Sequence, residues 1–118
     1  MSTAPLTLNL VQGSVAIRFS LEAAQELQSY LNELLQKLKL TASKSPSGSS
    51  RPTPQQPMEY RYTGDVFLEV FCNPNIWPSP FAAQVLITAR DDRIKVNAEA
   101  ELTRIIEDVN QYIEQLGS

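Results

Sequence analysis

Residues 83–116, AQVLITARDDRIKVNAEAELTRIIEDVNQYIEQL, contain the pattern from which the fold of this chain is predicted. Two short runs alternate apolar and polar residues on either side of Asp91 and Asp92, which is typical of a β-hairpin. With these two acids as the turn, one face of the hairpin is apolar and the other is polar. The apolar pairs are then Ala89 with Ile94 and Ile87 with Val96.

An amphipathic helix is predicted directly after this hairpin, with Asn97 as its N-cap and Gly117 as the residue that ends it. Its apolar residues recur at spacings of three and four, and they are Leu102, Ile105, Ile106, Val109, Ile113 and Leu116. Its acids predict a solvated outer face, and they are Glu99, Glu101, Glu107, Asp108 and Glu114. Neither the hairpin nor the helix can bury its apolar side alone, so both require a further layer of structure.

Residues 6–19, LTLNLVQGSVAIRF, predict another hairpin with Gln12 and Gly13 as a two-residue loop, because Gly13 supplies the positive φ of such a turn. The expected apolar pairs are Leu10 with Val15, Leu8 with Ile17 and Leu6 with Phe19. Ser20 is then the expected N-cap of a helix, whose apolar stripe is Ala24, Leu27, Leu31, Leu34, Leu35 and Leu38. This stripe covers barely two heptads, which favours packing on the protein's own sheet over a coiled coil.

Residues 58–72, MEYRYTGDVFLEVFC, are rich in β-formers, with Gly64 as a turn or bulge. Both faces of this stretch are largely apolar, which favours a central strand covered on two sides.

Residues 41–57 are rich in serine and proline, and we expect a flexible linker there. A hairpin-helix unit thus lies on each side of the linker, either as an ancient duplication or as two ordinary units.

These patterns predict a single α+β domain over residues 1–118. Its expected core is an antiparallel sheet of about five strands with the two amphipathic helices packed on one face.

Composition restricts the function. The chain has 118 residues, a net charge of −3 and no histidine, so we expect neither nucleic-acid nor membrane binding and no enzyme activity, catalytic residue, metal or cofactor. The first ten residues do not resemble a signal peptide, and Cys72 is the only cysteine, so a cytoplasmic protein is expected.

Asp91 and Asp92 are interpreted as turn formers in preference to a cation or acid-base site. Arg90, Arg93 and Lys95 are interpreted as a solubilising face in preference to a phosphate site.

One stretch is enriched in residues typical of recognition, namely Ile76, Trp77, Pro78, Pro80 and Phe81. Aromatic side chains anchor interfaces, and prolines hold them with little entropy left to lose on binding. The alternative is that Trp77 and Phe81 fold back and close one end of the core.

The favoured function is a protein-protein interaction or assembly module, whose partner is another protein or a second copy of this chain. The second hypothesis is a regulatory domain that binds a small molecule between sheet and helices, near Tyr60, Tyr62 and Trp77.

The last helix, EAELTRIIEDVNQYIEQL, resembles that of small uncharacterised proteins of cyanobacteria. The resemblance covers the last third of the chain and contains no diagnostic motif, so it implies no activity and no functional residue.

Overall fold

A computed structural model describes residues 4–42 and 54–117 of the chain, and these residues form six strands, one short 3₁₀ helix and two α-helices. In chain order the elements are β1 (Pro5–Asn9), β2 (Ser14–Arg18), α1 (Leu21–Ala42), β3 (Met58–Thr63), β4 (Phe67–Cys72), η1 (Pro74–Ile76), β5 (Gln84–Arg90), β6 (Lys95–Glu101) and α2 (Leu102–Gly117). The α+β class is confirmed. The strands form one sheet of four and a separate hairpin of two, where a single sheet of about five was predicted.

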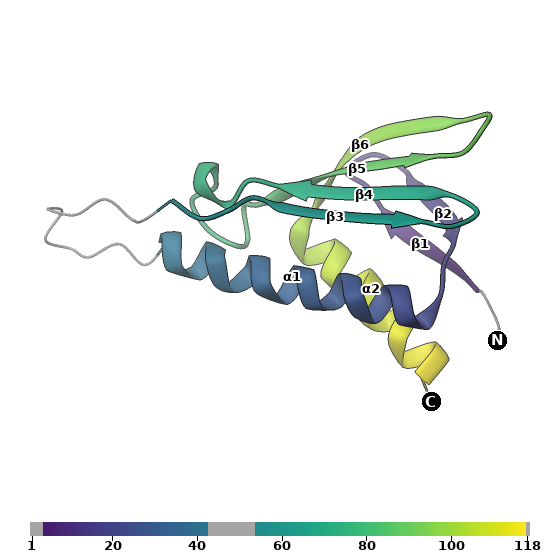
Figure 1. Cartoon of the computed structure of the whole chain (residues 1–118). Coiled ribbons are helices and arrows are strands. Elements are labelled where there is room, and N and C mark those ends of the chain that lie inside the picture. The colour runs from purple at the N-terminus through teal and green to yellow at the C-terminus, as the bar shows by residue number, and fades with distance from the viewer. Residues whose placement is uncertain (1–3, 43–53, 118) are drawn as a thin grey trace, which may run out of the picture.

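The larger sheet has the strand order β3-β4-β5-β6, and each neighbouring pair is antiparallel. Figure 1 shows that α1 and α2 both lie on one side of this sheet, as the sequence predicted. We call the side that faces the helices the inner face and the other side the outer face.

Residues 58–72 form two strands and not one. A turn or a bulge was predicted at Gly64, and the structure has a turn there, between β3 and β4. A side chain at Gly64 would collide with the ring of Tyr62, which explains why glycine suits this position. The expected cover on two sides is wrong, because the outer-face residues Phe67 and Phe71 of β4 are only half-buried. Phe67 is instead covered by the Arg90 guanidinium, which lies 4.6 Å from the ring centroid.

Both other hairpins lie where the sequence predicted them, but each loop has four residues instead of two. In the first, Leu8 pairs with Val15 and Leu6 with Ile17. In the second, Ala89 pairs with Val96 and Arg90 with Lys95, so Ile94 lies in the loop and is exposed. Each loop is closed by a backbone hydrogen bond from its first residue to its fourth, from Leu10 N to Gly13 O and from Asp91 N to Ile94 O, both at 2.9 Å. Gly13 has the expected positive φ, at 84°.

Helix α2 begins at Leu102, so the predicted N-cap at Asn97 is wrong. Asn97 lies within β6, opposite Thr88, and its side-chain oxygen accepts a hydrogen bond from the Thr88 hydroxyl at 2.7 Å. Strand pairing continues to Glu101, so Glu99 and Glu101 belong to the sheet and not to the helix.

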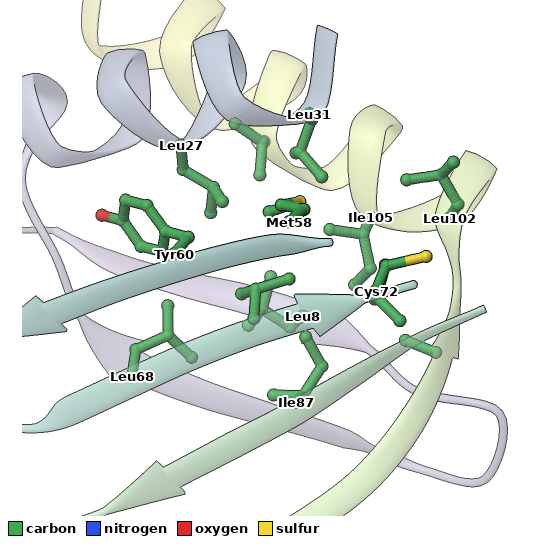
Figure 2. Packing of buried hydrophobic residues seen from close by; sticks show 14 of the residues in the cluster. Leu8, Leu27, Leu31, Met58, Tyr60, Leu68, Cys72, Ile87, Leu102 and Ile105 are labelled. Atoms are coloured by element: carbon green, nitrogen blue, oxygen red, sulfur yellow. The ribbon is translucent and has the colours of Figure 1, made fainter. Parts of the chain in front are cut away.

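The core is one cluster of apolar side chains between the inner face, the two helices and the first hairpin (Figure 2). Ser20 caps α1 as predicted, since its Oγ accepts a hydrogen bond from Ala23 N at 3.1 Å. The α1 stripe packs on the protein itself and not as a coiled coil, because Ala24, Leu27, Leu31, Leu34 and Leu38 are all buried. The predicted stripe of α2 is likewise buried or half-buried.

The first hairpin is attached to α2 by polar contacts. Asp108 is only 7% exposed, and its carboxylate accepts hydrogen bonds from Asn9 N at 2.8 Å and Asn9 Nδ2 at 2.9 Å. The Tyr112 hydroxyl donates to Ala4 O at 2.6 Å. The prediction that Asp108 lies on a solvated face is therefore wrong, because this carboxylate joins the first strand to the last helix.

Of the predicted linker, residues 43–53 lie outside the described residues. Thr41 and Ala42 belong to α1, and Gln55 is bonded to the loop after β4, so the ends of residues 41–57 are part of the fold. No helix in the two described segments is long and apolar enough to cross a membrane.

Candidate functional site

The predicted recognition residues lie in the connection between β4 and β5, which we call the 73–83 loop. Asn73 caps η1, since its side-chain oxygen accepts a hydrogen bond from Asn75 N at 3.0 Å. The Asn75 side chain then bonds the backbone of Gln55 in both directions, accepting from Gln55 N and donating to Gln55 O, each at 2.8 Å. At the other end of the loop, Ala82 N donates to Ser79 O at 3.2 Å. The loop is therefore held at three points.

The structure divides the five predicted residues by their exposure. Phe81 is 86% exposed and Ile76 is 67% exposed, which are the two largest values among the exposed large apolar side chains of the described residues. Pro78 is exposed and Pro80 is half-buried. Trp77 is half-buried and packs against the core. The alternative prediction therefore describes Trp77, whereas Phe81 does not cover the core.

Trp77 lies beside Cys72, the last residue of β4. Burial raises the pKa of the Cys72 thiol to about 11, and a hydrogen bond with the Trp77 side chain opposes part of this rise. The thiol is consequently protonated at neutral pH and buried, which makes it a packing residue and not a nucleophile.

We expect Trp77→Ala to lower the free energy of unfolding by about 1–3 kcal/mol, because the variant loses indole packing against the core. Phe81→Ala is the matched control within the same loop, and its effect should stay below about 0.5 kcal/mol because its ring is in water. Urea denaturation of the two variants measures both values. Equal stabilities of the two variants would contradict the assigned burial of Trp77.

Tyr60, one of the three residues near which the second hypothesis placed a small-molecule ligand, lies in the core. Tyr60 is 1% exposed, and its hydroxyl donates to Ala23 O at 3.2 Å. Its ring packs edge-on against Tyr30, at 5.3 Å between centroids. Burial raises the pKa of Tyr60, and the nearby Glu26 carboxylate raises it further. A ligand at this position would have to displace Tyr60 from the core.

Of the charged candidates, Asp91 has the contacts of a turn former. The Asp91 carboxylate accepts hydrogen bonds from Arg93 N and Ile94 N, both at 2.8 Å, and these bonds lower the pKa of Asp91. Asp91 therefore builds the turn, as predicted. Within residues 4–42 and 54–117, no group of three acids, cysteines or histidines lies close enough to hold a metal ion.

Two features of the surface were not predicted from the sequence. Leu86 is 44% exposed on the outer face, opposite Phe71 in the β4–β5 register, because β5 has nothing packed against that side among the described elements. Tyr30 is 41% exposed on α1, beside strand β3. A helical wheel places Tyr30 next to the buried stripe, but only the position of β3 shows which surface it borders.

No protein-family model, curated protein or solved structure matches this chain.

Proposed function

We propose that the protein is a non-enzymatic interaction module that binds another protein through Ile76 and Phe81 of the 73–83 loop. The observation that carries this proposal is the 86% exposure of the Phe81 side chain. Burial of an exposed aromatic ring by a partner makes the free energy of binding more favourable, and such rings are frequent anchors of protein interfaces.

The composition of the loop indicates what kind of partner surface it fits. No residue from Asn73 to Gln84 carries a charge. The buried centre of an interface is depleted in charge and enriched in aromatic residues, so the complementary surface is an apolar pocket or groove on a protein. An anionic ligand or nucleic acid would instead require cations at this position.

The loop is also suited to binding because little of it remains to be ordered. Its backbone is held by the Asn73 and Asn75 hydrogen bonds, and Pro78 and Pro80 fix two further φ angles. Trp77 supports the loop from the inside through its contact with the core. A segment that is ordered before binding loses less conformational entropy in the complex.

This function is proposed for the cytoplasm. A single buried cysteine fits a reducing compartment, because it needs no disulfide partner.

The Phe81→Ala variant should lose partner binding, since the ring that anchors the interface is removed. The matched control is Ile94→Ala, which removes another exposed apolar side chain, 63% exposed in the β5–β6 turn. Immobilised wild type, Phe81→Ala and Ile94→Ala are compared for the proteins that each retains from native extract. A protein retained by wild type and Ile94→Ala but at least about tenfold less by Phe81→Ala supports the proposal.

Salt dependence provides the second criterion. Because the loop is uncharged, we expect retention to change little between low and high ionic strength. Retention that is equal for all three proteins, or that disappears in high salt, would contradict an apolar anchor at Phe81.

A further inference from the structure

The four-stranded sheet ends at β3, and no strand in residues 4–42 or 54–117 pairs with the outer edge of β3. The opposite edge strand, β6, receives a hydrogen bond from the first hairpin, from Val11 N to Glu99 O at 2.9 Å. An open strand edge presents backbone N–H and C=O groups that can pair with another strand. We infer that a second copy of this chain pairs antiparallel along β3, joining two four-stranded sheets into one sheet across a two-fold axis.

The two faces of β3 restrict how two copies can pair. Met58, Tyr60 and Tyr62 are on the inner face, whereas Glu59, Arg61 and Thr63 are on the outer face. Residues directly opposite each other in a sheet point to the same side. If the helices of both copies lie on one side of the joined sheet, inner-face residues must therefore oppose inner-face residues. A shift of one residue would put the two helix layers on opposite sides.

The charges on the outer face select one of the remaining registers. If Glu59 opposes Glu59, or Arg61 opposes Arg61, like charges meet at the two-fold axis, which is destabilising. If Tyr60 opposes Tyr60, each Glu59 lies opposite Arg61 of the second copy, so two pairs of opposite charge form. Strand β3 is therefore self-complementary in charge in this one register.

Arg61 retains donors for such a pair. Within its own chain Arg61 Nε lies 3.1 Å from Glu69, and Nη2 lies 3.5 Å from Glu59. A guanidinium has five N–H donors, so these contacts leave others for Glu59 of the second copy. The Arg61 side chain is 62% exposed and the Glu59 side chain is 50% exposed, so both can be reached.

The helix layer supplies an apolar contact at the same position. Tyr30 packs edge-on against Tyr60, which in this register lies at the two-fold axis. The exposed Tyr30 ring is therefore near the axis, and a groove lined by Tyr30, Met58 and Glu59 opens beside it between α1 and β3. A stable interface buries at least about 1,200 Å², more than one short strand pair supplies, so the two α1 helices must also contribute.

Analytical ultracentrifugation of the full chain over a concentration series up to about 100 μM tests the inference. Wild type should sediment as a dimer, whereas Arg61→Glu and Glu59→Arg should each raise the dimer dissociation constant about tenfold or more, because each places like charges opposite one another. Mixed in equal amounts, these two variants should form a heterodimer, since every charge then faces its opposite. Lys95→Glu is the matched control, because it makes the same charge change on the outer face of the other edge strand, and its dimer should be unaffected.

A wild-type protein that stays monomeric, or a dimer that Arg61→Glu leaves intact, would overturn the inference. So would two folded single variants that remain monomeric when mixed. In wild type, amide hydrogen exchange of Met58–Thr63 should also slow as the protein concentration rises, and unchanged exchange in a dimer would place the interface elsewhere. Phe81→Ala should still dimerise, so failure of this inference and failure of the proposed loop function are separate results.

Discussion

Ile105→Ala is expected to lower the free energy of unfolding by about 2–5 kcal/mol, one of the two largest effects of a single substitution that we predict. Ile105 is 0% exposed and points from α2 into the cluster that contains Leu8, Leu31 and Ile87 (Figure 2). Truncation removes three carbon atoms from a packed site and leaves a cavity that the neighbouring strands and helices fill only in part.

Gln111→Ala is the control for this substitution, because Gln111 lies on the same helix and is exposed. Its effect should stay under about 0.5 kcal/mol. Urea denaturation curves of the two variants give both values. Small and equal shifts of the two midpoints would mean that the inner side of α2 is wrongly identified.

Asp108→Ala is expected to cost about 2–4 kcal/mol, although aspartate on a helix surface usually contributes little. The substitution removes the acceptor of both Asn9 hydrogen bonds and the partner of Arg104, whose Nε lies 3.4 Å from the carboxylate. The Asn9 backbone N–H is then left without its acceptor at a part-buried position.

Glu107→Ala is the matched control, since Glu107 is the adjacent acid on α2 and is exposed. It should change the unfolding free energy by less than about 0.5 kcal/mol. Thermal or urea melts of both variants provide the comparison. An Asp108→Ala variant as stable as Glu107→Ala would show that the contact between β1 and α2 adds no net stability.

The sequence predicted which side chains of the paired strands face the core, although it predicted both hairpin loops two residues too short. A shift of two residues keeps the side chains of the paired strands on their original faces, so Leu6, Leu8 and Ile17 are buried as expected, whereas Ile94 falls in the longer loop and is exposed. The length of each loop depends on hydrogen bonds within the turn, which the alternation of apolar and polar residues does not predict. At Asp91, for example, the side chain bonds Arg93 N and Ile94 N and thereby stabilises a longer turn.

Two errors in the last third of the chain arise from contacts that local residue preferences do not contain. Asn97 is a good N-cap by local preference, but the opposite strand, through Thr88, keeps it in the sheet. Asp108 follows the pattern of a solvated helix face, yet Asn9 lies 99 positions earlier in the chain and buries it. Local patterns cannot indicate a partner that distant.

The candidate site was predicted at the level of the segment. Proline and aromatic content identified the 73–83 loop, but the sequence did not distinguish the half-buried Trp77 from the exposed Phe81. The different exposure of Trp77 and Phe81 depends on Cys72 and the core beneath the loop, which only the folded chain brings together.

The β3 edge was missed because residues 58–72 were interpreted as one central strand, whereas the turn at Gly64 makes β3 an edge strand.

The contact between the first strand and the last helix has a consequence for biosynthesis. Ala4 and Asn9 are translated about a hundred residues before Tyr112 and Asp108, to which they bond. Leu6 and Leu8 of the β1–β2 hairpin are buried in the cluster that also contains Leu102, Ile105 and Val109 of α2, and an isolated two-stranded hairpin is marginally stable in water. Until α2 is translated, the part of the core that α2 supplies is missing, so we expect these leucines to remain accessible to a chaperone. Docking of α2 closes the core, so the native fold is completed only after nearly the whole of this sequence has been translated.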